Sequence, residues 1–246
     1  MKTTILLLSL TCLAAHADDD AAAATARMLD PKLNVAQRNN ACYELRGSAS
    51  PETIAALAQA LEVPEVRACA ARNLREAGAV DELKTALMAS DPEMRAAAAR
   101  ELGALGRTDL IEPLAQAARD PNLLVATNAV EGLSQYQDPS VLPPLLSLAE
   151  SGGPVAAMAL NRAAEFNDPG VLTVARKLMA TRDATLRLAA LRAIGDFGDA
   201  ADLPALRELA AKAERAAPSG RGFGLVPAID LSRAAQNAIR QIESRR

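Results

Sequence analysis

Aromatic residues, histidine and cysteine are scarce in this sequence. Its 246 residues include no Trp, one His, two Tyr, three Phe and three Cys. The histidine, His16, stands near the N-terminus, so the rest of the chain has no imidazole for a metal site or a nucleophile–base pair. The net charge is −3 with both signs interspersed, which disfavours a nucleic-acid surface. The sequence therefore predicts no catalysis, no metal or other cofactor, and no nucleic-acid partner.

Long apolar runs are missing too, except at the N-terminus. Lys2, the apolar residues 5–13 and Ala15-His16-Ala17 are typical of the three parts of a secretory signal peptide. The apolar run has about half of the roughly 20 residues that a membrane-spanning helix needs. We predict that residues 1–17 are cleaved and that the protein is exported to the periplasm without membrane insertion. An uncleaved anchor and a lipoprotein linked through Cys12 are the alternatives.

The chain is rich instead in alanine and leucine, arranged in a pattern that recurs roughly every 30 residues. Each copy has apolar residues at i, i+4, i+8 and i+11, which form one face of a helix. Full copies begin at Val66, Met94, Val125, Val155, Leu186 and Leu231, and a degraded first copy before them reads Gln37, Ala41, Leu45, Ser48. A second apolar segment follows each of the first six, at 51–61, 80–87, 110–118, 141–149, 171–179 and 203–213. We therefore predict stacked helical hairpins with almost no strands.

Asp, often followed by Pro, marks the expected helix starts. Asp suits the N-cap, and Pro suits the first helical position. The marked positions are Asp30, Asp91, Asp120, Asp138, Asp168, Asp183 and Asp230. One interval, from Leu186 to Leu231, is longer than the others because a Gly- and Pro-rich segment, 217–228, is inserted there. Insertions in repeat proteins emerge as loops and often bind partners. Arg221 and Phe223 in this segment are candidate partner contacts, and a loop folded back on the last hairpin is the alternative.

The segments DPEMRAAAARELG (91–103) and DATLRLAALRAIG (183–195) resemble HEAT repeats, and in particular the short variety named after phycobilisome lyases. The resemblance covers about residues 30–245. It implies an all-α fold, an α-solenoid of about six hairpins with a C-terminal capping helix. One repeat domain would then span 30–246 and follow an acidic, Ala-rich segment, 18–29. The family implies a binding scaffold more than an enzyme.

Arginine recurs directly after the first apolar position of a copy, as Arg38, Arg67, Arg95 and Arg187. One interpretation is a structural ladder in which each Arg pairs with an acid at the start of a neighbouring helix. The other is a row that binds acidic groups of a ligand. Most charged rows on repeat proteins are solvated or paired within the chain, which favours the structural ladder.

Cys42 and Cys69 are the two thiols that remain after signal cleavage. An even cysteine count in an exported protein favours a disulfide. Two buried thiols in alanine-like positions are the alternative, because a bridge needs Cα atoms within roughly 7 Å.

The leading functional hypothesis is a non-catalytic scaffold that binds a protein or peptide on a concave face lined by the second helices. The exposed polar positions predicted there are Lys84, Glu112, Gln116, Arg176, Lys177, Arg207 and Lys212. Their mixed charge suits a protein surface. The alternatives are a structural spacer in an envelope complex, a lyase-type enzyme, and a small-ligand binder.

Overall fold

The computed structural model describes residues 19–216 and 230–245, with the side chains of 212–216 left out. The predicted signal peptide, the insertion at 217–228 with Arg221 and Phe223, and the side chain of Lys212 therefore lie outside the described residues. Within the described ranges the chain is helical and contains no strand, which confirms the all-α prediction.

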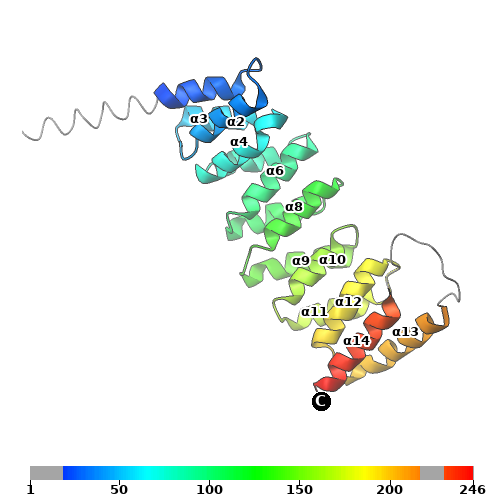
Figure 1. Ribbon diagram of the computed structural model, residues 1–246. Coiled ribbons are helices and arrows are strands. Elements are labelled where there is room, and N and C mark those ends of the chain that lie inside the picture. The colour runs from blue at the N-terminus through cyan, green and yellow to red at the C-terminus, as the bar shows by residue number, and fades with distance from the viewer. Residues whose placement is uncertain (1–18, 217–229, 246) are drawn as a thin grey trace, which may run out of the picture. The chain divides into compact units, whose positions relative to one another are not determined.

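The helices alternate between the two series that the repeat predicts (Figure 1). The first helices of the hairpins are α2 (Val35–Glu44), α4 (Pro64–Glu76), α6 (Pro92–Gly103), α8 (Leu123–Leu133), α10 (Ala156–Ala164) and α12 (Ala184–Phe197), and α14 (Leu231–Ser244) ends the series. The second helices are α3 (Pro51–Ala60), α5 (Val80–Leu87), α7 (Ile111–Ala117), α9 (Leu142–Ser151), α11 (Pro169–Leu178) and α13 (Leu203–Ala216). Short 3-10 turns, η1 (Thr108–Leu110), η2 (Pro139–Val141) and η3 (Ala200–Asp202), lead into α7, α9 and α13.

The chain divides into two compact units, Met1–Gln135 and Tyr136–Arg246, here called the N-terminal and C-terminal units. In each unit, consecutive hairpins stack, which is the α-solenoid arrangement that the repeat predicts. Residues 19–29, for which no fold was predicted, form a further helix in the N-terminal unit. Its Ala24 and Met28 are buried, and the Met28 carbonyl accepts a hydrogen bond from Arg38 Nε at 3.0 Å.

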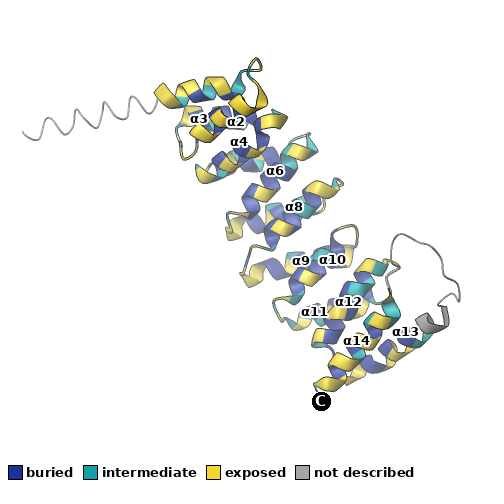
Figure 2. Cartoon of the chain, viewed as in Figure 1, coloured by how far each residue is buried: buried dark blue, intermediate teal, exposed yellow. Residues whose placement is uncertain are grey.

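The core consists of small and branched apolar side chains. Figure 2 shows the buried stretches of the helices in dark blue. Alanine at the second position of the repeat face is fully buried in successive helices, as Ala41, Ala70, Ala98 and Ala129 show. Small side chains at these positions let the helices approach closely. One close approach joins α6 to α8, where a Cβ atom built on Gly103 would lie 2.3 Å from the Gly132 Cα atom.

Several helix starts lie where the Asp pattern predicts them. Asp91, Asp168, Asp183 and Asp230 are N-caps whose carboxylates accept backbone N–H bonds, and Asp138 caps η2 in the same way. The prediction was wrong at Asp30, because its carboxylate closes a turn by accepting the Lys32 N–H and α2 begins only after Asn34. Asn34 and Gln37 form a reciprocal capping box there.

Asp120 is the second wrong start. The helix α8 begins after Asn122, whose side chain caps it. The Asp120 carboxylate is engaged elsewhere, by Arg95 and by the Asn122 N–H. The Asp120 carboxylate therefore lies two residues before the cap, where it accepts from Arg95 of the preceding hairpin.

Candidate partner-binding groove

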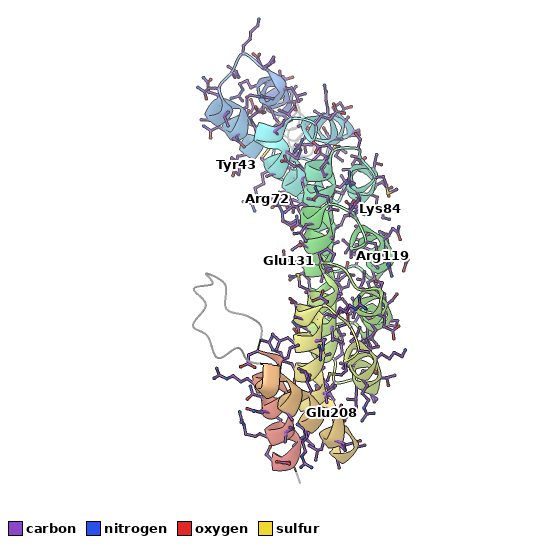
Figure 3. The ribbon with its side chains drawn as sticks, turned by 90° about the vertical axis from the view of Figure 1, so that its right-hand side faces the viewer. Tyr43, Arg72, Lys84, Arg119, Glu131 and Glu208 are labelled. Carbon is purple, nitrogen blue, oxygen red and sulfur yellow. A yellow bond between two sulfur atoms is a disulfide. The ribbon has the colours of Figure 1, made fainter. Side chains whose placement is uncertain are left out.

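Three of the residues predicted to contact a partner lie together in the N-terminal unit. Lys84 on α5 and Glu112 and Gln116 on α7 line one groove between these two second helices, with a volume of about 700 Å³. Figure 3 shows Lys84 and Arg119, which also lines this groove, on one side of the unit, and Tyr43, Arg72 and Glu131 on the other. We call this surface the α5–α7 groove.

The α5–α7 groove has an apolar surface. Leu87, Met88 and Ala89 contribute to it from the end of α5, and Pro113 and Ala117 from α7. Met88 is 81% exposed, the largest exposure given for a bulky apolar residue in the described part of the chain. It follows the last residue of α5, so its side chain projects from the helix end and not into the hairpin core. An exposed methionine in an apolar groove is a typical anchor point for a bound segment, because its unbranched thioether adapts to different partners.

The charges in the α5–α7 groove differ in how far they are neutralised. Arg95 donates two hydrogen bonds to the Asp120 carboxylate, from Nε at 2.7 Å and Nη2 at 3.0 Å. The Lys84 Nζ atom lies 3.9 Å from Asp109 Oδ2. Within the described residues Glu112 forms no hydrogen bond or ion pair through its carboxylate, although it lines the groove. A cation of a partner would therefore find Glu112 available.

The Arg95–Asp120 pair carries a prediction for acid stability. The hydrogen bond from Arg95 lowers the pKa of Asp120, and the same bond raises the pKa of Arg95. Because the folded-state pKa of Asp120 lies below its unfolded value of about 3.9, the stabilisation is complete above that value and is lost as the pH falls through the folded pKa. We expect Asp120→Asn to flatten the loss of stability below about pH 4, measured by urea unfolding at several pH values. Asp81→Asn, at an exposed and unpaired carboxylate, is the control, and equal pH profiles for both variants would contradict the expectation.

The first three members of the arginine row pair with acids near the start of the next first helix. Arg38 lies 3.7 Å from Glu65, and Arg67 donates to Asp91 at 2.5 Å and to Glu93 at 2.8 Å. Arg95 bonds Asp120 as described. Arg187 forms no such pair within the described residues, and its Nε atom has no hydrogen-bond partner there. Arg38, Arg67 and Arg95 thus link consecutive hairpins and have few donors left for a ligand.

Cys42 on α2 and Cys69 on α4 form a disulfide with Cα atoms 6.3 Å apart. Both residues are buried. Beside them the buried Asn73 donates its Nδ2–H to the Cys42 carbonyl at 2.7 Å. The first two hairpins are therefore joined covalently and by a buried hydrogen bond. The repeat pattern gives no signal for Asn73, because its carbonyl partner lies 31 residues earlier.

Arg176, Lys177 and Arg207, the other predicted contact residues whose side chains the structure describes, lie in the C-terminal unit and are paired within it. Arg176 donates to both carboxylate oxygens of Asp202, at 2.8 and 2.9 Å, and this hydrogen bonding lowers the pKa of Asp202. Lys177 bonds Glu150 at 2.7 Å, and Arg207 bonds Glu243 at 2.8 Å. These residues link neighbouring helices, so reversing their charge would disturb the packing of the unit as well as any partner contact.

Two further properties concern the described ranges 19–216 and 230–245. They contain no group of three or more His, Cys, Asp or Glu side chains placed to hold a metal ion. No helix in them has the length and apolar character needed to cross a membrane.

The repeat pattern of this chain is shared by a known repeat family. No curated protein matches the sequence. Human deoxyhypusine hydroxylase, in complex with glycerol, is 19% identical, with coverage of 94% of this chain and 98% of that chain and a TM-score of 0.42. An engineered protein is 20% identical, with coverage of 89% and 67% and a TM-score of 0.44. A family model described as HEAT repeats matches residues 80–160 and 153–217, more than half of the sequence, so the chain belongs to the HEAT-repeat family.

Proposed function

We propose that this protein is a non-catalytic scaffold that binds a protein or peptide partner in the α5–α7 groove. The observation that carries the proposal is Met88, which is 81% exposed in a groove of about 700 Å³ whose surface is largely apolar. Large exposed apolar side chains gathered in a concave surface are typical of interaction sites. Repeat proteins of stacked hairpins use such surfaces for binding.

The proposal includes export to an oxidising compartment. The residues before Asp18 have the composition of a secretory signal. The disulfide between Cys42 and Cys69 supports the same compartment, because structural disulfides are rare in reducing cytosol.

Site-specific photo-crosslinking tests the proposed groove. A photoreactive phenylalanine analogue placed at position 88 should give a defined adduct with a partner in the native cells, because the side chain at this position is exposed in the groove. The same analogue at position 131, an exposed position on the other side of the N-terminal unit (Figure 3), is the control and should give none.

A substitution at the same position tests whether the apolar side chain of Met88 is needed for binding. Met88→Glu replaces an apolar surface by a charge in the groove that Glu112 also lines, so we expect the isolated partner to bind at least about tenfold more weakly. Met88 is solvent-exposed, and the stability of the variant should stay within about 0.5 kcal/mol of the parent. Adducts at position 131 and none at position 88 would contradict the proposal. Adducts from a third analogue placed on α14, with none at position 88, would also contradict it and would support a spacer that contacts partners through its end.

A further inference from the structure

A second groove lies next to the first, on the other side of α5. It runs between α3 and α5, has a volume of about 430 Å³ and is lined in part by Leu61, Ala86 and Met94. Three carboxylates, of Glu62, Asp81 and Glu82, line it as well, and no Lys or Arg does. We call it the α3–α5 groove.

The three carboxylates have no counter-charge in the structure. Glu62 and Asp81 are exposed and Glu82 is partly exposed. Their carboxylates take part in no ion pair or hydrogen bond within the described residues. Across α5, the charges of Arg95 and Lys84 already face Asp120 and Asp109, while Glu112 is unpaired. The surface formed by the two grooves therefore offers unpaired carboxylates next to an apolar surface.

The helix α5 separates the two grooves and contributes to both. Lys84 and Met88 line the α5–α7 groove, and Asp81, Glu82 and Thr85 line the α3–α5 groove. A packed helix occupies about 8–10 Å of such a surface. An extended peptide advances about 3.3 Å per residue, so it crosses one helix with about three residues. Two side chains about three residues apart can thus occupy the two grooves at once.

We propose that the two grooves together bind an extended partner segment that carries an apolar side chain and, about three residues away, lysine or arginine. The apolar side chain lies against Leu87 and Met88, and the cation lies among Glu62, Asp81 and Glu82. This inference rests on the proposed function, since it names the chemistry of the partner of the same surface. Opposite charge at the rim of an apolar contact raises the association rate and selects the partner.

Three synthetic probes test the charge of the bound segment. They are the peptides Lys-Lys-Ser-Ser-Leu-Ser-Ser-Lys-Lys, the same sequence with Glu in place of Lys, and the same sequence with Ser in place of Lys. Their symmetry makes the result independent of the direction of binding. The readout is the NMR signal of the Met88 methyl group in the full chain labelled with ¹³C-methyl methionine, assigned with the variant Met88→Leu.

We expect the lysine probe to shift the Met88 signal with a dissociation constant at least about fivefold lower than that of the serine probe, and the glutamate probe to bind more weakly than either. High salt should reduce the advantage of the lysine probe. In the triple variant Glu62→Gln, Asp81→Asn, Glu82→Gln, the lysine and serine probes should bind within about twofold of each other. Glu131→Gln, on the other side of the unit, should leave the advantage unchanged.

The outcomes separate this inference from the proposed function. Equal binding of the three probes, tighter binding of the glutamate probe, or an advantage of the lysine probe that survives the triple variant would each overturn the proposed partner chemistry while the α5–α7 groove remains a binding site. A Met88 signal that none of the probes shifts, together with no photo-crosslink at position 88, would overturn the proposed function itself.

Discussion

Replacing Gly103 by alanine should destabilise the N-terminal unit by about 3 kcal/mol, near the upper end of the range for overpacked cores. The added Cβ atom would lie 2.3 Å from the Gly132 Cα atom, and this neighbour is backbone that cannot rotate away. Gly103 ends α6, where helix propensity alone would make alanine stabilising by up to about 1 kcal/mol. The close approach of α6 and α8 therefore predicts an effect of opposite sign to that of propensity.

Chemical unfolding of three variants checks this expectation. Gly132→Ala should cost less than Gly103→Ala, since its Cβ atom would meet Gly103 Cα at 3.0 Å. Ala104→Ser adds one atom at the exposed neighbouring residue and is the control, with a change of at most about 0.5 kcal/mol. A Gly103→Ala variant as stable as the Ala104→Ser variant would show that α6 and α8 do not pack this closely.

Removing the disulfide by the double substitution Cys42→Ala and Cys69→Ala should lower the stability of the N-terminal unit by about 3.5 kcal/mol. The bond closes a loop between residues 27 apart, for which the chain-entropy estimate gives roughly that value. Alanine suits the first site, because Ala71 and Ala99 occupy the equivalent positions in the next two copies and are buried. The loss of stability in the double variant should therefore report the missing covalent bond and little change in core packing.

Reduction provides the control for this prediction. Dithiothreitol should lower the unfolding midpoint of the parent protein towards that of the double variant and leave the double variant unchanged. In protein isolated from native cells, a thiol-reactive probe applied to the denatured chain should label neither Cys42 nor Cys69 until the chain is reduced. Labelling without reduction would contradict both the bridge and the proposed export.

The fold could be predicted from the sequence because each hairpin repeats the same apolar face. The first three positions of the faces that begin at Val66, Met94 and Val125 lie in α4, α6 and α8, and the fourth position lies just beyond the end of each helix. Helix starts could be predicted where the Asp carboxylate accepts from the backbone of the helix that follows, as at Asp91, which caps α6 and also pairs with Arg67. They could not be predicted at Asp30, whose carboxylate closes a local turn at Lys32, or at Asp120, whose carboxylate accepts from the distant Arg95.

The candidate site could be predicted only in part. Lys84, Glu112 and Gln116 could be predicted because the helical period places them on the exposed side of the second helices. Met88 was missed because it lies one residue beyond α5, where the period no longer determines the direction of the side chain. The ion pairs of Arg176 and Arg207 were missed because their acids, Asp202 and Glu243, lie 26 and 36 residues later. Sequence periodicity tells which face a residue occupies, but not which neighbour neutralises it.

The spacing of the arginine pairs has a consequence for how the chain reaches its fold. Arg67, Arg95 and Arg176 find their acids 24 to 26 residues later, in the hairpin that follows. A growing chain can therefore complete these contacts as soon as the next hairpin has emerged, without waiting for distant segments. Contacts of such short range are associated with rapid folding. Each hairpin can thus serve as a template on which its successor assembles.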